Sequence, residues 1–143
     1  FGDWNRVYGS RGFLQYQFLV PFGEEATFRR IVEKIADSPH ASGLNVLKRF
    51  GKGNQAPLSF PQPGWTITVD FPIARSLHRL CEELDELVLG AGGRFYLAKE
   101  SRVSAANFRR GYPRFDEWRK VRDAVDPEGV FASDMSRRLE LTK

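Results

Sequence analysis

The sequence predicts an α+β fold of the ferredoxin-like type, in which an antiparallel β-sheet carries helices on one face. The first observation is the order of strand and helix patterns between Phe13 and Ala98, which is β-α-β-β-α-β. The second is that residues 99–143 contain no strand pattern and have the character of a helical appendage. With 143 residues, 41% of them hydrophobic, the chain is long and apolar enough for one domain with a core.

The strand predictions depend on short runs that are rich in β-branched and aromatic residues. Prolines at positions 21 and 72 close the first and third runs, because proline cannot donate to a strand ladder. The predicted strands are Phe13–Val20, Leu44–Phe50, Trp65–Phe71 and Arg94–Ala98.

The helix predictions depend on apolar residues that recur with helical spacing. Glu24–Asp37 has such a stripe, and Ser38-Pro39 ends it. Ala74–Leu89 has a longer stripe that includes the single cysteine, Cys81, which we therefore expect to be a small core residue. Glycines at positions 90, 92 and 93 stop this helix.

Residues 99–143 are predicted to add helices without strands. Phe115, Trp118, Val121 and Val125 mark one amphipathic helix, and Ser104–Arg110 has the pattern of another helical turn or two. The apolar face of this segment has no evident partner within the chain, so we expect it to pack on another structure.

Composition and motifs exclude several classes of protein. One cysteine rules out an internal disulfide, and the two histidines lack the spacing of metal ligands, so no metal site is expected. The net charge is +4, with acidic and basic residues interleaved. The phosphate-binding glycine motifs of dinucleotide folds and nucleotide hydrolases are absent, as is a G-x-S-x-G nucleophile motif.

The candidate binding and catalytic residues of the predicted sheet are polar residues that interrupt the apolar strand pattern. They are Gln15 and Gln17 in the first strand, Lys48 in the second, Thr66 and Thr68 in the third, and Lys99 at the end of the fourth. If their faces coincide, amides, hydroxyls and ammonium groups share one small area that suits a polar, anionic ligand. A solvated sheet face is the alternative. The long Gly- and Pro-rich loop Gly51–Gly64 adds a further functional candidate.

The same segments resemble the FAD-linked oxidases related to vanillyl-alcohol oxidase. The resemblance is carried by LQYQFLVPFG from Leu14, by VLKRFG from Val46, and by YLAK from Tyr96. PGW at Pro63, VDFP at Val69, GGR at Gly92, YPR at Tyr112 and the C-terminal DP, SD and RRL add to it. These motifs run in order along nearly the whole chain.

The resemblance implies the substrate-side half of a flavin site. Residues 1–98 would belong to the substrate (cap) domain, and residues 99–143 would return to the FAD domain, whose large N-terminal portion this chain lacks. Lys48, Gln15 and Gln17 match residues that line the substrate pocket, with Val46 and Phe50 as its apolar walls. Lys99 matches a lysine that contacts the flavin ring, where a cation would stabilise the reduced form. A mycobacterial member of the family has asparagine and cysteine where this chain has Thr66 and Thr68, which leaves the identity of the substrate open.

The implied activity is oxidation of a CH–OH group of a sugar or polyol, such as a polyprenyl-phosphosugar, with FAD held by the full-length enzyme and absent from this fragment. Lys48 is a candidate base only if burial lowers its pKa. The rival hypothesis is a non-catalytic, ferredoxin-like module that binds a ligand or RNA. For RNA, Trp65–Phe71 lacks the required Lys/Arg-Gly-aromatic signature, so no nucleic acid is expected. The exposed apolar tail predicts a fragment dimer. The resemblance points to a bacterium and leaves the cytoplasm and the cell envelope both open.

Overall fold

The computed structural model describes residue 6, residues 10–40 and residues 43–142, and shows a four-stranded antiparallel sheet with helices. The strands lie in the order β2-β3-β1-β4, so the two central strands are β1 and β3. This arrangement confirms the predicted α+β fold and the β-α-β-β-α-β order. The strands are β1 (Phe13–Pro21), β2 (Asn45–Phe50), β3 (Gly64–Pro72) and β4 (Arg94–Phe95).

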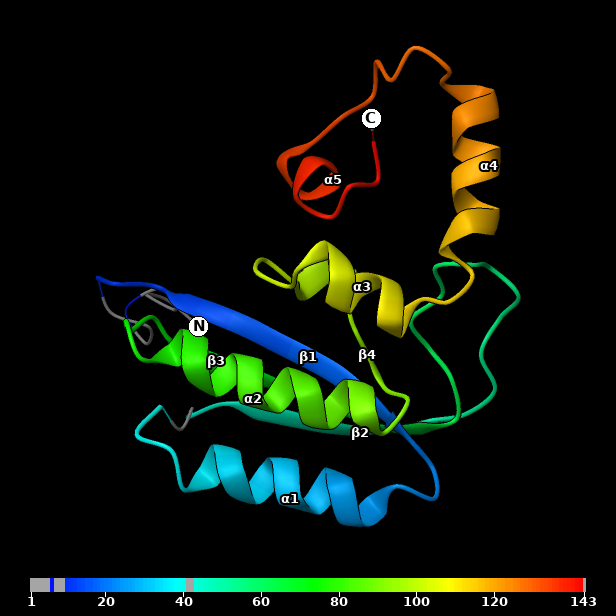
Figure 1. Ribbon diagram of the computed structural model, residues 1–143. Helices are drawn as coiled ribbons and strands as arrows, with labels where there is room; N and C mark the ends of the chain where they lie inside the picture. Colours follow the sequence, from blue (N-terminus) through cyan, green and yellow to red (C-terminus); the bar gives the residue numbers. More distant parts are fainter. Residues whose placement is uncertain (1–5, 7–9, 41–42, 143) are drawn as a thin grey trace.

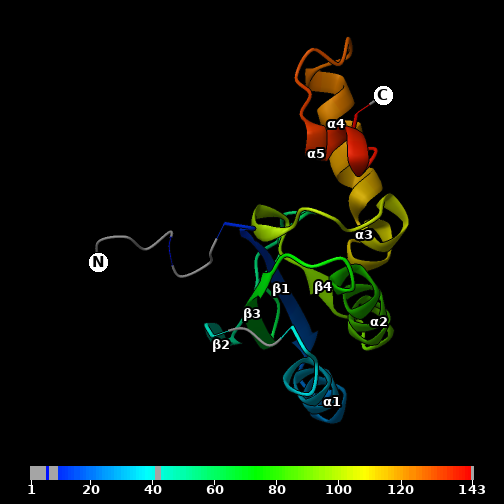
Figure 2. The ribbon, with the colours of Figure 1, turned by 90° about the vertical axis from the view of Figure 1, so that its left-hand side faces the viewer.

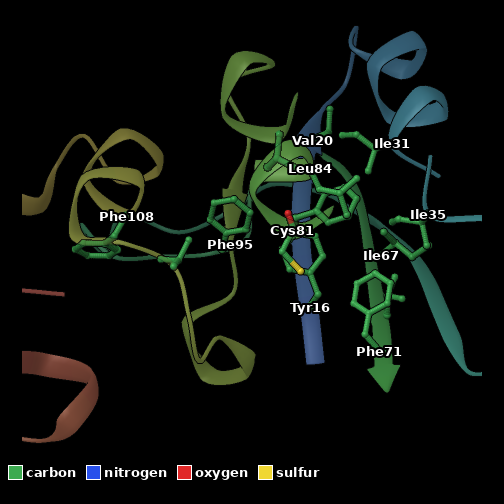
Figure 3. Packing of buried hydrophobic residues seen from close by; sticks show 14 of the residues in the cluster. Tyr16, Val20, Ile31, Ile35, Ile67, Phe71, Cys81, Leu84, Phe95 and Phe108 are labelled. Atoms are coloured by element: carbon green, nitrogen blue, oxygen red, sulfur yellow. The ribbon is translucent and has the colours of Figure 1, made fainter. Parts of the chain in front are cut away.

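Two helices, α1 (Glu25–Ala36) and α2 (Leu77–Gly90), lie on the same face of the sheet, as predicted (Figures 1 and 2). Side chains alternate along a strand, so every second residue of β1 and β3 points toward these helices. Tyr16 and Val20 of β1 lie near Cys81 and Leu84 of α2 there (Figure 3). Phe18 belongs to the same core, and Cys81 is fully buried. The apolar stripe of α2 and the helix-facing residues of β1 therefore form one hydrophobic core.

The fourth strand is shorter than the prediction. It covers only Arg94–Phe95, and Leu97–Lys99 forms the 3-10 turn η2, so Lys99 does not end a strand. The Tyr96 N–H still donates to the Gln17 carbonyl, but the Lys99 N–H donates back to the Tyr96 carbonyl. The Glu100 carboxylate then accepts the next backbone N–H groups, and the chain leaves the sheet. Local hydrogen bonds thus compete successfully with the strand pattern.

Residues 100–142 form helices joined by loops, without a strand, as predicted. Helix α3 (Ala105–Gly111) packs against β4 and α2, and α4 (Phe115–Val125) has the predicted bounds. Helix α5 (Asp134–Arg138) was not predicted, because only five residues form it and no periodicity is visible. A capping box between Ser133 and Ser136 begins it. Helices α4 and α5 stand away from the sheet at the top of Figure 1.

Helix α4 and the segment after it expose large apolar side chains. Val121, Val125, Val130 and Phe131 are between 65% and 82% exposed. Val121, Val125 and Phe131, together with Trp118, Met135 and Leu141, border a groove of about 490 Å³ between α4 and α5. This groove is the unpartnered apolar face that the sequence predicts. None of the helices in the described part of the chain is long and apolar enough to cross a bilayer.

A buried ionic cluster joins the C-terminal segment to the sheet. Asp85 of α2 is 1% exposed; it accepts a hydrogen bond from the Tyr16 hydroxyl at 2.8 Å and pairs with the Arg102 guanidinium at 2.5 Å. Burial raises the pKa of Asp85, while the Arg102 charge opposes that rise. Glu100 accepts the Arg138 guanidinium at 2.8 Å, which ties the far end of the chain to the same turn. The cluster therefore connects β1, α2, η2 and α5.

Replacing Asp85 by alanine is expected to lower the free energy of unfolding of this chain by about 3–5 kcal/mol, because Arg102 would keep a buried charge without its counter-ion. Urea denaturation followed by circular dichroism measures the change. The matched control is Glu86→Ala, which removes the neighbouring but exposed ion pair with Arg110 and should leave stability nearly unchanged. If both variants lost the same free energy of unfolding, the buried Asp85–Arg102 pair would contribute no more to stability than the exposed Glu86–Arg110 pair, and the prediction would be wrong.

Candidate functional site

The strand register brings the predicted polar residues onto one face of the sheet. Gln17 lies opposite Thr68, and Thr68 lies opposite Val46 on the other side. Lys48 lies opposite Thr66. Residues directly opposite each other in an antiparallel pair point to the same side, so these side chains share the face that the helices leave uncovered. Gln15 and Phe50 belong to it by the same alternation.

A hollow of about 520 Å³ lies at one end of this face. Four of the predicted site residues line it, namely Gln17, Lys48, Phe50 and Lys99. The other lining residues are Asn54, Leu58, Ser59, Phe60, Pro61, Tyr96, Leu97 and Tyr112. Gln15, Val46, Thr66 and Thr68 are on the same face but do not line the hollow.

Hydrogen bonds hold the amide of Gln17 in place. Its Nε2 donates to the Thr66 hydroxyl at 3.2 Å, and that hydroxyl donates to the Phe18 carbonyl at 2.7 Å. Gln17, Thr66 and Thr68 are 6%, 0% and 5% exposed, so this part of the sheet is not a solvated face. Thr66 is thus placed behind the hollow, where it orients Gln17.

Two lysines bring positive charge to the hollow from different elements. Lys48 lies on the edge strand β2 and is exposed, and Lys99 lies in η2 and is half-buried. Neither ammonium group forms an ion pair with a carboxylate within the part of the chain that the structure describes. Burial, the condition under which Lys48 was a candidate base, is not met in this chain. Two unpaired cations beside an oriented amide suit a ligand with oxygen atoms and negative charge.

Phe60 and Tyr96 extend the predicted Phe50 wall of the hollow, and the sequence did not assign either of them to the site. Phe60 is stacked on Tyr96 with ring centroids 4.8 Å apart, and its ring meets Phe50 edge-on at 5.8 Å. The sequence signals were indirect: Phe60 lies in the long loop marked as a functional candidate, and Tyr96 begins the YLAK motif. The positions of the two rings could not be read from spacing, because the loop has no periodicity.

The loop that carries Phe60 folds tightly onto itself. A Cβ atom on Gly53 would lie 2.2 Å from the Pro61 carbonyl oxygen, so only glycine allows this approach. The turn brings residues 58–61 back over the hollow after the chain has left β2 at Phe50. The length of the loop is therefore used to build one side of the site.

Comparison with known proteins identifies the family of this chain. The D-arabinono-1,4-lactone oxidase family matches residues 16–139, and the chain therefore belongs to that family of oxidoreductases. This result confirms the predicted resemblance to FAD-linked oxidases, with this chain as a C-terminal portion.

Individual relatives are similar over different shares of the chain. It is 60% identical over 141 residues to decaprenylphosphoryl-beta-D-ribose oxidase of Mycolicibacterium smegmatis, covering 99% of this chain and 31% of that protein. An uncharacterised protein of Streptomyces coelicolor is 44% identical over 131 residues, which are 91% of this chain and 36% of that protein. L-gulono-1,4-lactone dehydrogenase of Mycobacterium tuberculosis is 36% identical over 56 residues, 39% of this chain and 13% of that protein. The chain thus spans about a third of the length of the first two relatives.

Thr66→Val is expected to lower the free energy of unfolding by about 1–3 kcal/mol, because it leaves the buried Gln17 amide and the Phe18 carbonyl without their shared partner. Thr66→Ser keeps the hydroxyl and should retain most of the stability. Urea denaturation of both variants separates the loss of the hydrogen bonds from the loss of a methyl group. A larger loss in the serine variant would show that packing, and not the hydroxyl, matters at this position.

Proposed function

We propose that this chain is the C-terminal, substrate-side portion of an FAD-dependent oxidase that oxidises a CH–OH group of a sugar or polyol. The observation that carries the proposal is the meeting of Gln17, Lys48 and Lys99 around one hollow. These residues come from β1, β2 and η2, and they combine an oriented amide with two unpaired cations. The 60% identity to a decaprenylphosphoryl-ribose oxidase supports a polyprenyl-phosphosugar as the substrate class.

The residues on this side of the site fit a flavin cofactor. Lys99 borders the hollow together with the aromatic side chain of Tyr96, and it has no carboxylate partner within the described residues. When bound, FAD accepts hydride from a C–H bond, and the reduced ring carries negative charge. Lys99 would stabilise that charge electrostatically, with most of the contacts to FAD coming from the missing portion.

The substrate would occupy the rest of the polar face. The Gln17 amide and the Lys48 ammonium group would bind sugar oxygens, and Thr66 keeps the amide correctly oriented. Phe50 supplies an apolar wall to the hollow. Gln15, Val46 and Thr68 extend the same face beyond it and would contact the parts of the substrate farther from the reacting carbon.

The missing N-terminal portion is the proposed partner of the C-terminal segment. Relatives are about three times as long as this chain, and the groove between α4 and α5 is apolar and open. Residues 1–98 would then act as the substrate domain, and residues 99–143 would carry the chain back to the FAD domain. Packing of that domain on Val121, Val125 and Phe131 would bury the exposed apolar surface.

In the full-length enzyme, Lys48→Ala is expected to slow anaerobic flavin reduction by a polyprenylphosphoryl ribose about 10²-fold, the size of effect expected when a positioned charged group is lost from a site. Stopped-flow absorbance in the flavin bands measures the rate. Lys52→Ala is the matched control, because Lys52 lies four residues further along the chain and borders a different hollow. An unchanged rate in Lys48→Ala would remove Lys48 from the site and with it the main support for the proposal.

The fragment by itself is expected to purify without flavin and to dimerise through the α4–α5 groove, because both the FAD portion and the cover of the groove are missing. Visible absorbance and sedimentation velocity test these two points. Phe131→Asp should shift the fragment to a monomer, whereas Leu47→Asp, which changes an exposed apolar residue of β2, should leave the dimer intact. A yellow fragment with one flavin per chain would contradict the first expectation.

A further inference from the structure

Arg94 is an unusual cation beside the candidate site: it does not line the hollow, but it contacts Ser59 and Tyr112, which do. It is half-buried in β4, and its guanidinium makes no ion pair with any carboxylate of the described residues. One terminal N–H group donates to the Ser59 carbonyl at 2.9 Å, while Nε is buried without a hydrogen-bond partner. Burial accordingly lowers the pKa of this arginine. A half-buried charge without a counter-ion lowers the stability of the fold, so a functional role for Arg94 would explain its presence.

The contacts of Arg94 join three segments that are distant in sequence. The guanidinium carbon lies 5.3 Å from the centre of the Tyr112 ring, a cation–π contact with the residue that ends α3. The Tyr112 hydroxyl donates to the Phe95 carbonyl at 2.6 Å, which fixes the ring beside β4. Arg94 is thus held by β4 and Tyr112 on one side, and it holds the loop at Ser59 on the other.

The loop residue next to Ser59 forms the aromatic wall of the hollow. Phe60 is 5% exposed, and it is stacked on Tyr96 and in edge contact with Phe50. The loop has no strand or helix of its own, so its backbone depends on such tertiary contacts for a defined position. Arg114 donates to the Gln55 carbonyl at 2.8 Å, but it is exposed and already bound to Glu117. The contact at Ser59, the residue directly before Phe60, is made by the half-buried Arg94.

We propose that Arg94 is a positioning residue of the substrate pocket, which clamps the loop at Ser59 and so sets Phe60 against Tyr96. The stacked wall then offers an apolar surface to the sugar in the same hollow as the polar groups Gln17 and Lys48. Arg94 acts through Phe60 and does not touch the substrate. This inference rests on the proposed function of the hollow, because it assigns the wall to substrate recognition.

A double-mutant cycle in the full-length flavoenzyme tests the inference. Arg94→Met, Phe60→Ala and the double variant are compared for kcat and KM with a short-chain polyprenylphosphoryl ribose. Each single variant should lower kcat/KM about tenfold, mainly through KM, and the double variant should be no worse than Phe60→Ala alone. Independent, multiplying losses in the double variant would overturn the inference, because they would show that Arg94 does not act through the wall.

Control variants separate positioning from general stability. Arg49→Met removes another cation–π contact, with the guanidinium 4.7 Å from the Phe22 ring on the far face of the sheet, and should leave kcat/KM unchanged. Arg94→Lys keeps a charge and a donor and should recover part of the loss; it replaces Arg94→Met in the cycle if the methionine variant yields no flavoprotein. Reduced flavin content with unchanged kcat/KM of the remaining holoenzyme would indicate a purely structural role and contradict the inference.

The Lys48→Ala variant, measured beside these, separates this inference from the proposed function. If Lys48→Ala slows flavin reduction while Arg94→Met leaves kcat/KM unchanged, the positioning role of Arg94 is wrong and the oxidase site stands. If Lys48→Ala has no effect either, the proposed function of the hollow is wrong, and the inference fails with it.

Discussion

The long antiparallel pairing of β1 with β3 is the constraint on which the rest of this structure depends. Phe13 through Pro21 pair without interruption with Pro72 back to Gly64, and one register therefore governs both central strands. Because side chains alternate, that register sends Tyr16, Phe18 and Val20 to the helices and Gln15 and Gln17 to the opposite face. A slip of one residue would exchange the two faces, burying amides under α2 and exposing aromatic rings.

The pairing of β1 with β3 consequently determines both the hydrophobic core on one face of the sheet and the candidate site on the other. On the helix side, the apolar stripes of α1 and α2 close over the strands, and Asp85 is accommodated among them by Tyr16 and Arg102. On the other side, the regular pairing of β1 with β3 places the Thr66 hydroxyl where it donates a hydrogen bond to the Phe18 carbonyl and accepts one from the Gln17 amide. The rigidity that the core gives to β1 and β3 is what holds Gln17 at a defined place in the hollow.

The C-terminal segment contributes residues both to the hydrophobic core and to the candidate site. Phe108 and Phe115 enter the main core, the Arg102–Asp85 pair anchors the turn that follows β4, and Tyr112 borders the hollow. Farther along, α4 and α5 leave the sheet and present an open apolar groove. The chain spans about a third of the length of its first two relatives, and this groove is the surface on which we propose that the rest of the oxidase packs.

The sequence by itself determined the order of elements, the two faces of the sheet and the polar set on one of them, because those features follow from periods of two and 3.6 residues that are local to each segment. It also indicated that Lys48, Gln17 and Lys99 belong together, through a family resemblance that the comparisons confirm. Only the tertiary structure decided that β4 ends at Phe95, that Phe60 stacks on Tyr96, and that the half-buried Arg94 forms no ion pair with a carboxylate of the described residues. Those outcomes depend on contacts between segments far apart in the chain and on a loop without periodicity, and local spacing carries no information about either.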